Sequence, residues 1–400
     1  MTDFNFDKKV NRFGTNSEKW DIRNAEETWD LRKSELPMWV ADMDFEAAPC
    51  IKEAIRKRLK EGVFGYSYVP AEWYDAYISW WERRHGFGMK KDELIFCTGV
   101  VPAISSVIRK LTTPAEKVLV MTPVYNIFFH SIVNNGRVPL ECPLIIGTSG
   151  KYEIDWERFT EYCEDPQTTM FLLCNPQNPI GILWDKETLT RIGAICAANG
   201  VLVLSDEIHC DIAKPGLSYT PFASINETNA RNCIMCIAPS KAFNIAGLNS
   251  AAVWVGNPKL YNKVKRGLNT DEVAEPGVFA VQAAVAAFSE GEAWLNAMNS
   301  YIAANKAYVK NFIEKNLPVL KDYSQDATYL SWIDARALQI PKLQTVLRKE
   351  AGLWFSDGAV YGKGNDGFLR INVACPFQYV EEAMRRLETF VHTHALTEQG

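Results

Sequence analysis

Two stretches decide the fold of this chain: VLVLSDEIH at residues 201–209 and CIMCIAPSKAFNIAG at residues 233–247. Each begins with a short apolar run of the kind that is buried on both faces of a sheet, and continues into a turn with charged or polar side chains. Similar runs lie elsewhere: LIFC at 94–97, VLVM at 118–121, MFLLC at 170–174 and AAVWV at 251–255. Helix-like stretches, such as residues 186–199, lie between them. The alternation predicts an α/β domain with a mostly parallel sheet built from these runs.

The two ends of the chain follow a different pattern. A helix is expected at residues 49–60, because proline fits its first turn and an apolar residue recurs every four positions. These apolar residues are Ile51, Ile55 and Leu59. We expect three parts: an N-terminal segment (1–45) that packs with the small domain, a large α/β domain (46–289), and a smaller α+β domain (290–400) with further helices and strands.

The composition excludes several classes of protein. Hydrophobic residues make up 47% of the 400 residues, so a large core is expected and disorder is excluded as the main state. Lys plus Arg number 43 against 48 for Asp plus Glu, and this mild net charge of -5 argues against nucleic-acid and anionic-membrane partners. No apolar run reaches the ~18 residues of a membrane span, and the polar N-terminus predicts no secretory signal. Ten scattered cysteines suit reduced thiols, which predicts a cytoplasmic protein.

Candidate site residues follow the apolar runs, because ligands of open α/β sheets bind beyond the carboxyl ends of the strands. Asp206 could face a protonated pyridine nitrogen and make that ring an electron sink, or it could be a helix N-cap. Lys241 lies in an apolar turn, where burial lowers the pKa of a lysine and favours the neutral amine that attacks an aldehyde. The alternative for Lys241 is a side chain that extends to the surface.

Three further turns could serve the same ligand. Gly99, Val100 and Val101 open a helix whose backbone N–H groups could bind a phosphate, although plain capping explains the same residues. Ser240 could donate to a phosphate oxygen or satisfy its own turn. Tyr125 could stack on a flat ring, or it could be an ordinary half-buried tyrosine.

Three polar side chains complete the set of candidates. Asn175 could donate to a phenolate oxygen of the ring or form an Asx turn in its Asn-Pro sequence. His209 could serve the same oxygen or be structural. Arg370 lies in the apolar run FLRINV at 368–373, where its guanidinium needs an anionic partner. That partner could be a substrate carboxylate or an internal acid.

Metal and dinucleotide sites are not expected. Cys233 and Cys236 form a CxxC inside a predicted strand, where residues three apart point to opposite faces. His392 and His394 have no further ligand residues near them in the sequence. No GxGxxG follows the first strand, which argues against an NAD-dependent dehydrogenase.

The order of these features resembles that of fold-type I pyridoxal 5′-phosphate (PLP) enzymes of the aminotransferase superfamily. The shared series is a helix-opening glycine, an aromatic residue, an Asn-Pro turn, a strand-end Asp, a Ser-Lys pair and a late Arg. Four motifs are similar to the MalY/PatB group of cystathionine or cysteine-S-conjugate β-lyases: PMWVADMDF at 37–45, FGYSYVP at 64–70, DEIH at 206–209 and SKAFNIAGLN at 240–249. The resemblance covers nearly the whole chain and implies a three-layer large domain beside a smaller one.

The resemblance also implies a role for each matching residue. Lys241 would hold PLP as a Schiff base, and Asp206 would pair with the pyridine nitrogen. Tyr125 would stack on the ring, and Asn175 and His209 would contact its phenolic oxygen. The phosphate would be bound by Gly99, Val100, Val101, Ser240 and, in a homodimer, a partner subunit's Tyr66. Arg370 would bind the substrate carboxylate below the backbone of Trp39, Val40 and Ala41. Many aminotransferases have an Arg eight positions after the lysine. Asn249 stands there, which implies a phosphate held more by neutral donors.

The implied activity is cleavage of a carbon–sulfur bond in a small sulfur-containing amino acid. Lys241 would take the Cα proton of cystathionine, cysteine or an S-substituted cysteine, and a thiol, pyruvate and ammonia would be released. Transamination uses the same residues and is the closest alternative, because sequence spacing does not fix where the proton returns. A regulatory role in binding another protein, beside the lyase activity, is a second alternative.

Overall fold

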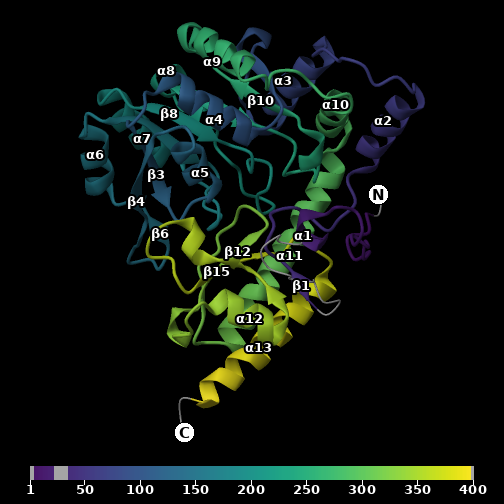
Figure 1. Cartoon of the computed structure of the whole chain (residues 1–400), viewed down its shortest axis with the longest axis vertical. Coiled ribbons are helices and arrows are strands. Elements are labelled where there is room, and N and C mark those ends of the chain that lie inside the picture. Colours follow the sequence, from purple (N-terminus) through teal and green to yellow (C-terminus); the bar gives the residue numbers. More distant parts are fainter. Residues whose placement is uncertain (1–3, 22–34, 398–400) are drawn as a thin grey trace.

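The computed structural model describes residues 4–21 and 35–397. Its larger sheet has seven strands in the order β2-β10-β9-β8-β7-β3-β4 (Figure 1). The strands are β2 (Leu94–Cys97), β10 (Ala251–Trp254), β9 (Cys233–Ile237), β8 (Leu202–Asp206), β7 (Thr168–Cys174), β3 (Lys117–Thr122) and β4 (Val138–Pro143). All six runs quoted from the sequence are therefore strands of one sheet.

One of these runs has the opposite direction from the one expected. β10 is antiparallel to both of its neighbours, whereas the β9, β8, β7, β3 and β4 pairs are parallel. Parallel neighbours need a crossover connection, usually a helix. The 238–250 connection between β9 and β10 contains only turns and one short 3-10 helix, so the chain returns antiparallel. The mostly parallel α/β sheet is confirmed, with this strand as the exception.

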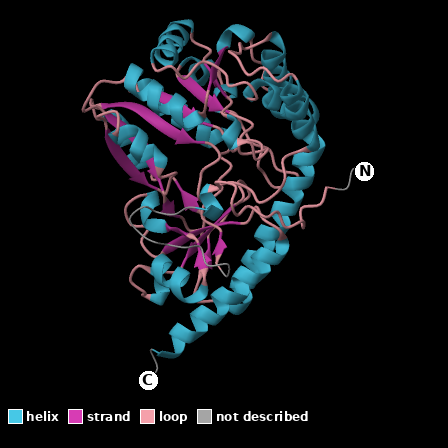
Figure 2. Cartoon of the chain, turned by 45° about the vertical axis from the view of Figure 1, so that its right-hand side comes forward, coloured by secondary structure: helices cyan, strands magenta, loops and turns pink. Residues whose placement is uncertain are grey.

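Helices cover both faces of the larger sheet, which gives three layers (Figure 2). One face packs against α4 (Val100–Leu111), α5 (Ile127–Val133) and α9 (Pro258–Thr270). The other face packs against α3 (Ala71–His85), α6 (Trp156–Glu164), α7 (Lys186–Ala198) and α10 (Ala280–Glu290). Cys233 belongs to one of these two apolar clusters and Cys236 to the other, as expected for residues three apart on a strand.

A second, smaller sheet lies below the first one in Figure 1. It is antiparallel, with the order β11-β12-β15-β14: β11 (Lys321–Asp322), β12 (Leu330–Asp334), β15 (Phe368–Asn372) and β14 (Ser356–Asp357). Its helices are α11 (Glu292–Asn316), α12 (Leu343–Ala351) and α13 (Phe377–Thr397). The exact division of the chain at residues 45 and 290 stays a prediction.

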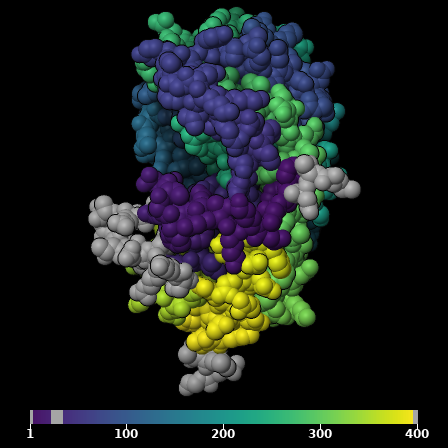
Figure 3. Space-filling model, turned by 90° about the vertical axis from the view of Figure 1, so that its right-hand side faces the viewer, coloured from purple at the N-terminus to yellow at the C-terminus, as the bar shows by residue number. Residues whose placement is uncertain are grey.

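The described N-terminal residues form the purple band in Figure 3, between the blue and green upper part of the molecule and its yellow lower part. There β1 (Leu36–Pro37) pairs in parallel with β13 (Leu353–Trp354). Farther along, the backbone N–H of Asp44 donates to the Ala374 carbonyl at 2.9 Å. Residues near the start of the chain are thus joined by backbone hydrogen bonds to residues near its end.

The expected helix at 49–60 is α2 (Pro49–Lys60). Its apolar stripe is only partly covered, because Ile51 is fully buried whereas Leu59 is 55% exposed. The chain that follows is also exposed and contains Phe64, Tyr66 and Tyr68. Among the described helices, none combines the length and the apolar character that a membrane span requires.

Candidate active site

A cavity of about 210 Å³ lies at the carboxyl ends of five strands of the larger sheet: β2, β9, β8, β7 and β3. Parallel strands bring the turns that follow them to one edge of the sheet, and β10 adds the residues that precede it. The cavity is lined by Ala41, Thr98, Gly99, Val100, Val101, Pro102, Tyr125, Cys174, Asn178, Asp206, Ile208, His209, Ser240, Lys241, Ala246, Asn249 and Ser250. Nine of the residues predicted as a cofactor or pocket site therefore lie together: Ala41, Gly99, Val100, Val101, Tyr125, Asp206, His209, Ser240 and Lys241.

Lys241 lies in the turn after β9, and its Nζ donates to the carbonyl oxygen of Ala41 at 2.7 Å. Burial lowers the pKa of its amine, and the nearby positive charge of Arg370 lowers it further. The carboxylates of Asp42 and Asp206 act in the opposite direction but do not outweigh burial. The amine is therefore more readily available in its neutral, nucleophilic form than a surface lysine is.

Asp206 is the last residue of β8 and is only 4% exposed. Burial raises the pKa of its carboxyl to about 7, although a hydrogen bond from the Ile208 backbone N–H and the charge of Lys241 both lower it. Within the described parts of the chain, Asp206 forms no ion pair. A cation placed against it would restore the ionised form, which is the property needed to hold a ring nitrogen protonated.

His209 provides a neutral ring in the same cavity. Burial lowers its pKa to about 3, and the charges of Lys241 and Arg370 add to the effect. Its Nδ1 has no hydrogen-bond partner among the described residues, although the side chain is almost fully buried. This ring nitrogen is therefore available to a ligand that enters the cavity.

The first turn of α4 offers the backbone N–H groups that were expected to bind a phosphate. Gly99 precedes the helix with an extended backbone, and Pro102 has no N–H. The Cβ atom of a side chain at Gly99 would lie 3.1 Å from the ring of Pro102, which is a tight contact, so glycine suits this position. Ser240 and Asn249 line the same cavity, and both are neutral donors; their contact with a phosphate stays a prediction.

A second cavity, of about 420 Å³, adjoins the first and shares Ala41, Tyr125 and Lys241 with it. Arg370 lines this cavity from β15 and is 5% exposed. Its guanidinium donates to the carbonyl of Trp39 at 2.7 Å and lies over the ring of Tyr361, while its Nε has no partner. No carboxylate of the described residues lies within ion-pair distance of Arg370, so its positive charge is available to an anion.

The backbone of Trp39, Val40 and Ala41 forms one wall of this second cavity. Its three carbonyl oxygens accept hydrogen bonds from Arg370, Asn372 and Lys241, in that order. The Ala41 oxygen also accepts a hydrogen bond from the hydroxyl of Tyr329 at 2.8 Å. The wall therefore connects the lysine of the larger sheet with the arginine of the smaller one.

The position of one predicted residue needs a correction. Asn175 is fully buried, but it does not line either cavity, and its side chain amide donates to the Thr220 carbonyl at 3.0 Å. Asn178, three residues later, lines the first cavity and lies 3.5 Å from the guanidinium of Arg370. The repeated Asn-Pro pair in NPQNP was the available signal, and only the geometry of the turn distinguishes its two asparagines.

Tyr125 and Tyr66 differ in whether they line a cavity of their own chain. Tyr125 lines both cavities, and burial raises the pKa of its hydroxyl to about 12, so it is a neutral ring there. Tyr66 is fully exposed and lines neither cavity. Its expected place in the site of a neighbouring subunit stays a prediction. Tyr329, which faces His209 edge to ring at 5.8 Å, had no sequence signal.

The order of the strands and the lysine, carboxylate and arginine around joined cavities define an enzyme of the aminotransferase type. The sequence profile of the family described as aminotransferase class I and II matches residues 36–387, and the chain belongs to this family.

Several of the relatives that the chain matches over nearly its whole length are lyases. The cystathionine beta-lyase PatB of Bacillus subtilis is 39% identical over 386 residues, which cover 96% of this chain and 99% of that protein. The protein MalY of Escherichia coli is 31% identical, with 96% and 98% covered. The crystal structure of cystalysin from Treponema denticola, which contains PLP, matches with a TM-score of 0.93 at 32% identity over 99% of this chain and 100% of that one. These comparisons confirm the predicted resemblance and fold class.

Proposed function

We propose that this protein is a PLP-dependent carbon–sulfur β-lyase. It cleaves L-cystathionine, cysteine or S-substituted cysteines to pyruvate, ammonia and a thiol. The observation that carries the proposal is the arrangement of Lys241 and Asp206 in one cavity, with Arg370, which has no carboxylate partner among the described residues, at the adjoining one. The relatives named cystathionine beta-lyase and the PLP-bound C-S lyase from Staphylococcus hominis, with a TM-score of 0.90 and 31% identity, support it.

The residues of the first cavity fit PLP. An enclosed amine suits the aldehyde, a buried carboxylate suits the pyridine nitrogen, and the helix N-terminus with neutral donors suits the phosphate. The unpartnered Nδ1 of His209 and the amide of Asn178 lie on the same cavity wall and suit the phenolic oxygen. When bound, PLP supplies an electron sink for the negative charge that develops at the Cα atom of the substrate.

Arg370, Lys241 and Asp206 have separate roles in the reaction. Arg370 holds the substrate α-carboxylate in the second cavity, where its free Nε and planar guanidinium suit two-point binding. Lys241, whose neutral amine is favoured by burial, takes the Cα proton. Asp206 stays ionised against the cation that faces it. The wall at Trp39–Ala41 lines the second cavity, and its Ala41 also lines the first.

The experiment that tests the proposal separates lyase from transaminase activity. S-ethylcysteine and 2-oxoglutarate are offered to the purified holoenzyme, separately and together. Steady release of pyruvate and ethanethiol without 2-oxoglutarate is expected. Turnover that strictly requires 2-oxoglutarate would show that the protein is an aminotransferase, the activity for which its family is named.

The homodimer is part of the same proposal. Tyr66 is fully exposed, and Phe64 and Tyr68 beside it are 53% and 80% exposed, so the segment presents an apolar surface. We place this segment against a second copy, with Tyr66 of one copy near the phosphate site of the other. A Tyr66→Phe variant with an unchanged affinity for PLP would contradict the hydroxyl contact. A second, regulatory role would survive in a Lys241→Ala variant.

A further inference from the structure

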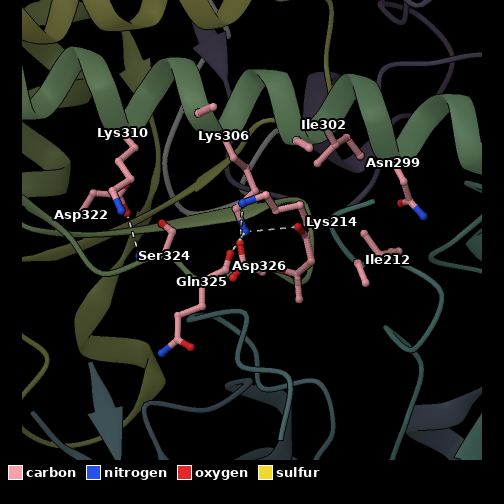
Figure 4. A pocket seen from close by; sticks show the side chains of 14 residues that line it. Ile212, Lys214, Asn299, Ile302, Lys306, Lys310, Asp322, Ser324, Gln325 and Asp326 are labelled. Atoms are coloured by element: carbon pink, nitrogen blue, oxygen red, sulfur yellow. Dashed lines mark hydrogen bonds and ion pairs between the residues drawn. The ribbon is translucent and has the colours of Figure 1, made fainter. Parts of the chain in front are cut away.

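One lysine outside both cavities has an amino group surrounded by backbone carbonyl oxygens. Lys306 lies in the middle of α11, and its Nζ donates to the carbonyl oxygens of Gln325 at 2.6 Å, Ala327 at 2.8 Å and Thr328 at 3.4 Å (Figure 4). Part of its side chain is exposed, but its amino group is enclosed. No carboxylate lies within ion-pair distance of it among the described residues. Three backbone dipoles thus take the place of a counterion.

The same turn, residues 325–328, is bound from its other side by the larger domain. The Gln325 and Ala327 N–H groups donate to the carbonyls of Ile180 and Gly181 at 2.7 and 2.9 Å. The Thr328 N–H donates to Ile212 at 2.9 Å. The turn therefore directs three N–H groups toward loops of the larger domain and three carbonyls toward Lys306, while the Asp326 carbonyl accepts from the Lys214 N–H at 2.8 Å.

The fit at Gly181 leaves the turn little freedom to move. A side chain at this position would lie 2.3 Å from the Ala327 oxygen, and the φ of +85° also favours glycine. Backbone contacts this close transmit a displacement of the turn directly to the loop that contains Gly181.

Each loop that the turn contacts leads to the cofactor cavity. The loop of Ile180 and Gly181 follows Asn178, and the loop of Ile212 follows His209. The turn itself leads into Tyr329, whose hydroxyl shares the Ala41 carbonyl with Lys241. Three of the groups around Lys241 are therefore attached to a turn that Lys306 holds.

We propose that Lys306 is a positioning residue for the active site: its ammonium group fixes the 325–328 turn, and through it Asn178, His209 and Tyr329. The activity readout for this inference depends on the proposed lyase function. The spectroscopic readout below depends only on bound PLP, so failure of the two proposals can be told apart.

The charges around Lys306 give the inference a pH dependence. Burial lowers its pKa to about 8; Asp322 from β11 and Asp326 from the turn raise the pKa, and Lys214 from the loop after His209 lowers it. Above about pH 8 the neutral amine has two N–H groups for three carbonyls. The hold on the turn should weaken in this range.

The structure offers suitable variants for the test. Lys306→Met removes the charge and keeps the length of the side chain, whereas Lys306→Arg keeps the charge at all accessible pH values. A cavity of about 160 Å³ beside Lys306 leaves room for the guanidinium (Figure 4). Lys310→Met is the matched control, because Lys310 lines the same cavity one helical turn away and pairs only loosely with Glu314 at 3.9 Å.

The holoenzymes are compared by kcat and KM for S-ethylcysteine and by pH titration of the visible absorbance of bound PLP. We expect Lys306→Met to bind PLP but to lose about 10- to 100-fold in kcat/KM. The pH at the midpoint of the absorbance titration should also shift. Lys310→Met should stay within about twofold of wild type. A folded, PLP-loaded Lys306→Met protein with wild-type kcat/KM and titration overturns the proposal.

Lys306→Arg keeps the test decisive if Lys306→Met does not fold. The wild-type kcat/KM should fall above about pH 8 with a component that Lys306→Arg lacks, because a guanidinium does not titrate there. Identical alkaline limbs for the two proteins would overturn the role of the ammonium charge. Loss of pyruvate release in wild type itself would refute the lyase function and leave the absorbance comparison intact.

Discussion

The turn after β9 and the middle of α11 each enclose the amino group of a lysine, and they do so in opposite ways. Lys241 donates to one carbonyl and borders two cavities, whereas Lys306 donates to three carbonyls. Burial lowers the pKa of both. The difference lies in the hydrogen-bonding capacity that remains: Lys241 keeps N–H capacity beside two cavities, whereas the three N–H groups of the Lys306 ammonium have three carbonyl acceptors.

This comparison shows that a lowered lysine pKa alone does not identify a nucleophile. Burial disfavours the charge in both places, but an amine whose hydrogen-bonding capacity is used up by backbone carbonyls is less available to a reaction partner. The carbonyl partners of Lys306 hold it in a fixed place, and a fixed cation with three acceptors is suited to organising backbone.

The largest effect should come from Lys241→Ala. The variant should lose at least about 10³-fold in kcat, because the amine that binds the aldehyde and takes the Cα proton is gone. Borohydride treatment should then no longer attach PLP to the protein, which mass spectrometry of the peptides can verify. Borohydride should still attach PLP to the Lys306→Met variant, because this variant retains Lys241. If it labelled Lys306 in the wild type instead, the assignment of the two lysines would be reversed.

Asp206→Ala should have the next largest effect. Removing the carboxylate leaves no anion to keep the ring nitrogen protonated, and we expect kcat to fall by about 10²- to 10³-fold. Asp206→Glu is the control that keeps the charge and should recover part of the loss. A rate for Asp206→Ala near that of wild type would show that the electron sink does not depend on this residue.

Substitutions of the two asparagines in the NPQNP turn should affect different properties of the protein. Asn178→Ala should raise the dissociation constant for PLP by about tenfold, because its amide lines the cavity of Lys241. Asn175→Ala should instead lower the unfolding free energy by about 1–3 kcal/mol, because it removes a buried hydrogen bond to Thr220. Equilibrium dialysis and thermal unfolding distinguish the outcomes. The reverse pattern would restore the original expectation for Asn175.

The smallest effect concerns stability at alkaline pH. The pKa of Lys306 is lower in the folded chain than its ordinary value, so the unfolded chain binds more protons above about pH 8. The cost of burying the ammonium is present in full below that pH and is relieved as pH rises. The stability of wild type relative to Lys306→Met should therefore increase from about pH 8 to 10, as unfolding at several pH values can show. A constant difference would mean that Lys306 does not titrate there.

Most of the fold could be predicted because each buried strand is an apolar run bounded by turn residues. The run at 251–255 was expected to be parallel, and its direction depends on the connection before it rather than on its own composition. Lys241, Asp206 and Arg370 could be predicted for the related reason that a charged residue inside an apolar run demands a partner.

The rest of the site depends on contacts that leave no local pattern. Asn175 and Asn178 are both followed by a proline, and only the turn decides which of the two faces the cavity. Lys306 occupies an ordinary position in a helix, and its partners are backbone carbonyls about twenty residues away, which any residue type supplies. Tyr66 needs a second chain.

The pairing of β1 with β13, and of Asp44 with Ala374, has a consequence for biosynthesis. Residues 36–44 leave the ribosome well before the residues that receive them, 353–354 and 374, are translated. The pairing at both places must therefore wait until these later residues have been synthesised. A nascent chain in which they are still missing contains Lys241 but lacks Arg370 and these backbone partners of the residues around the carbonyl wall.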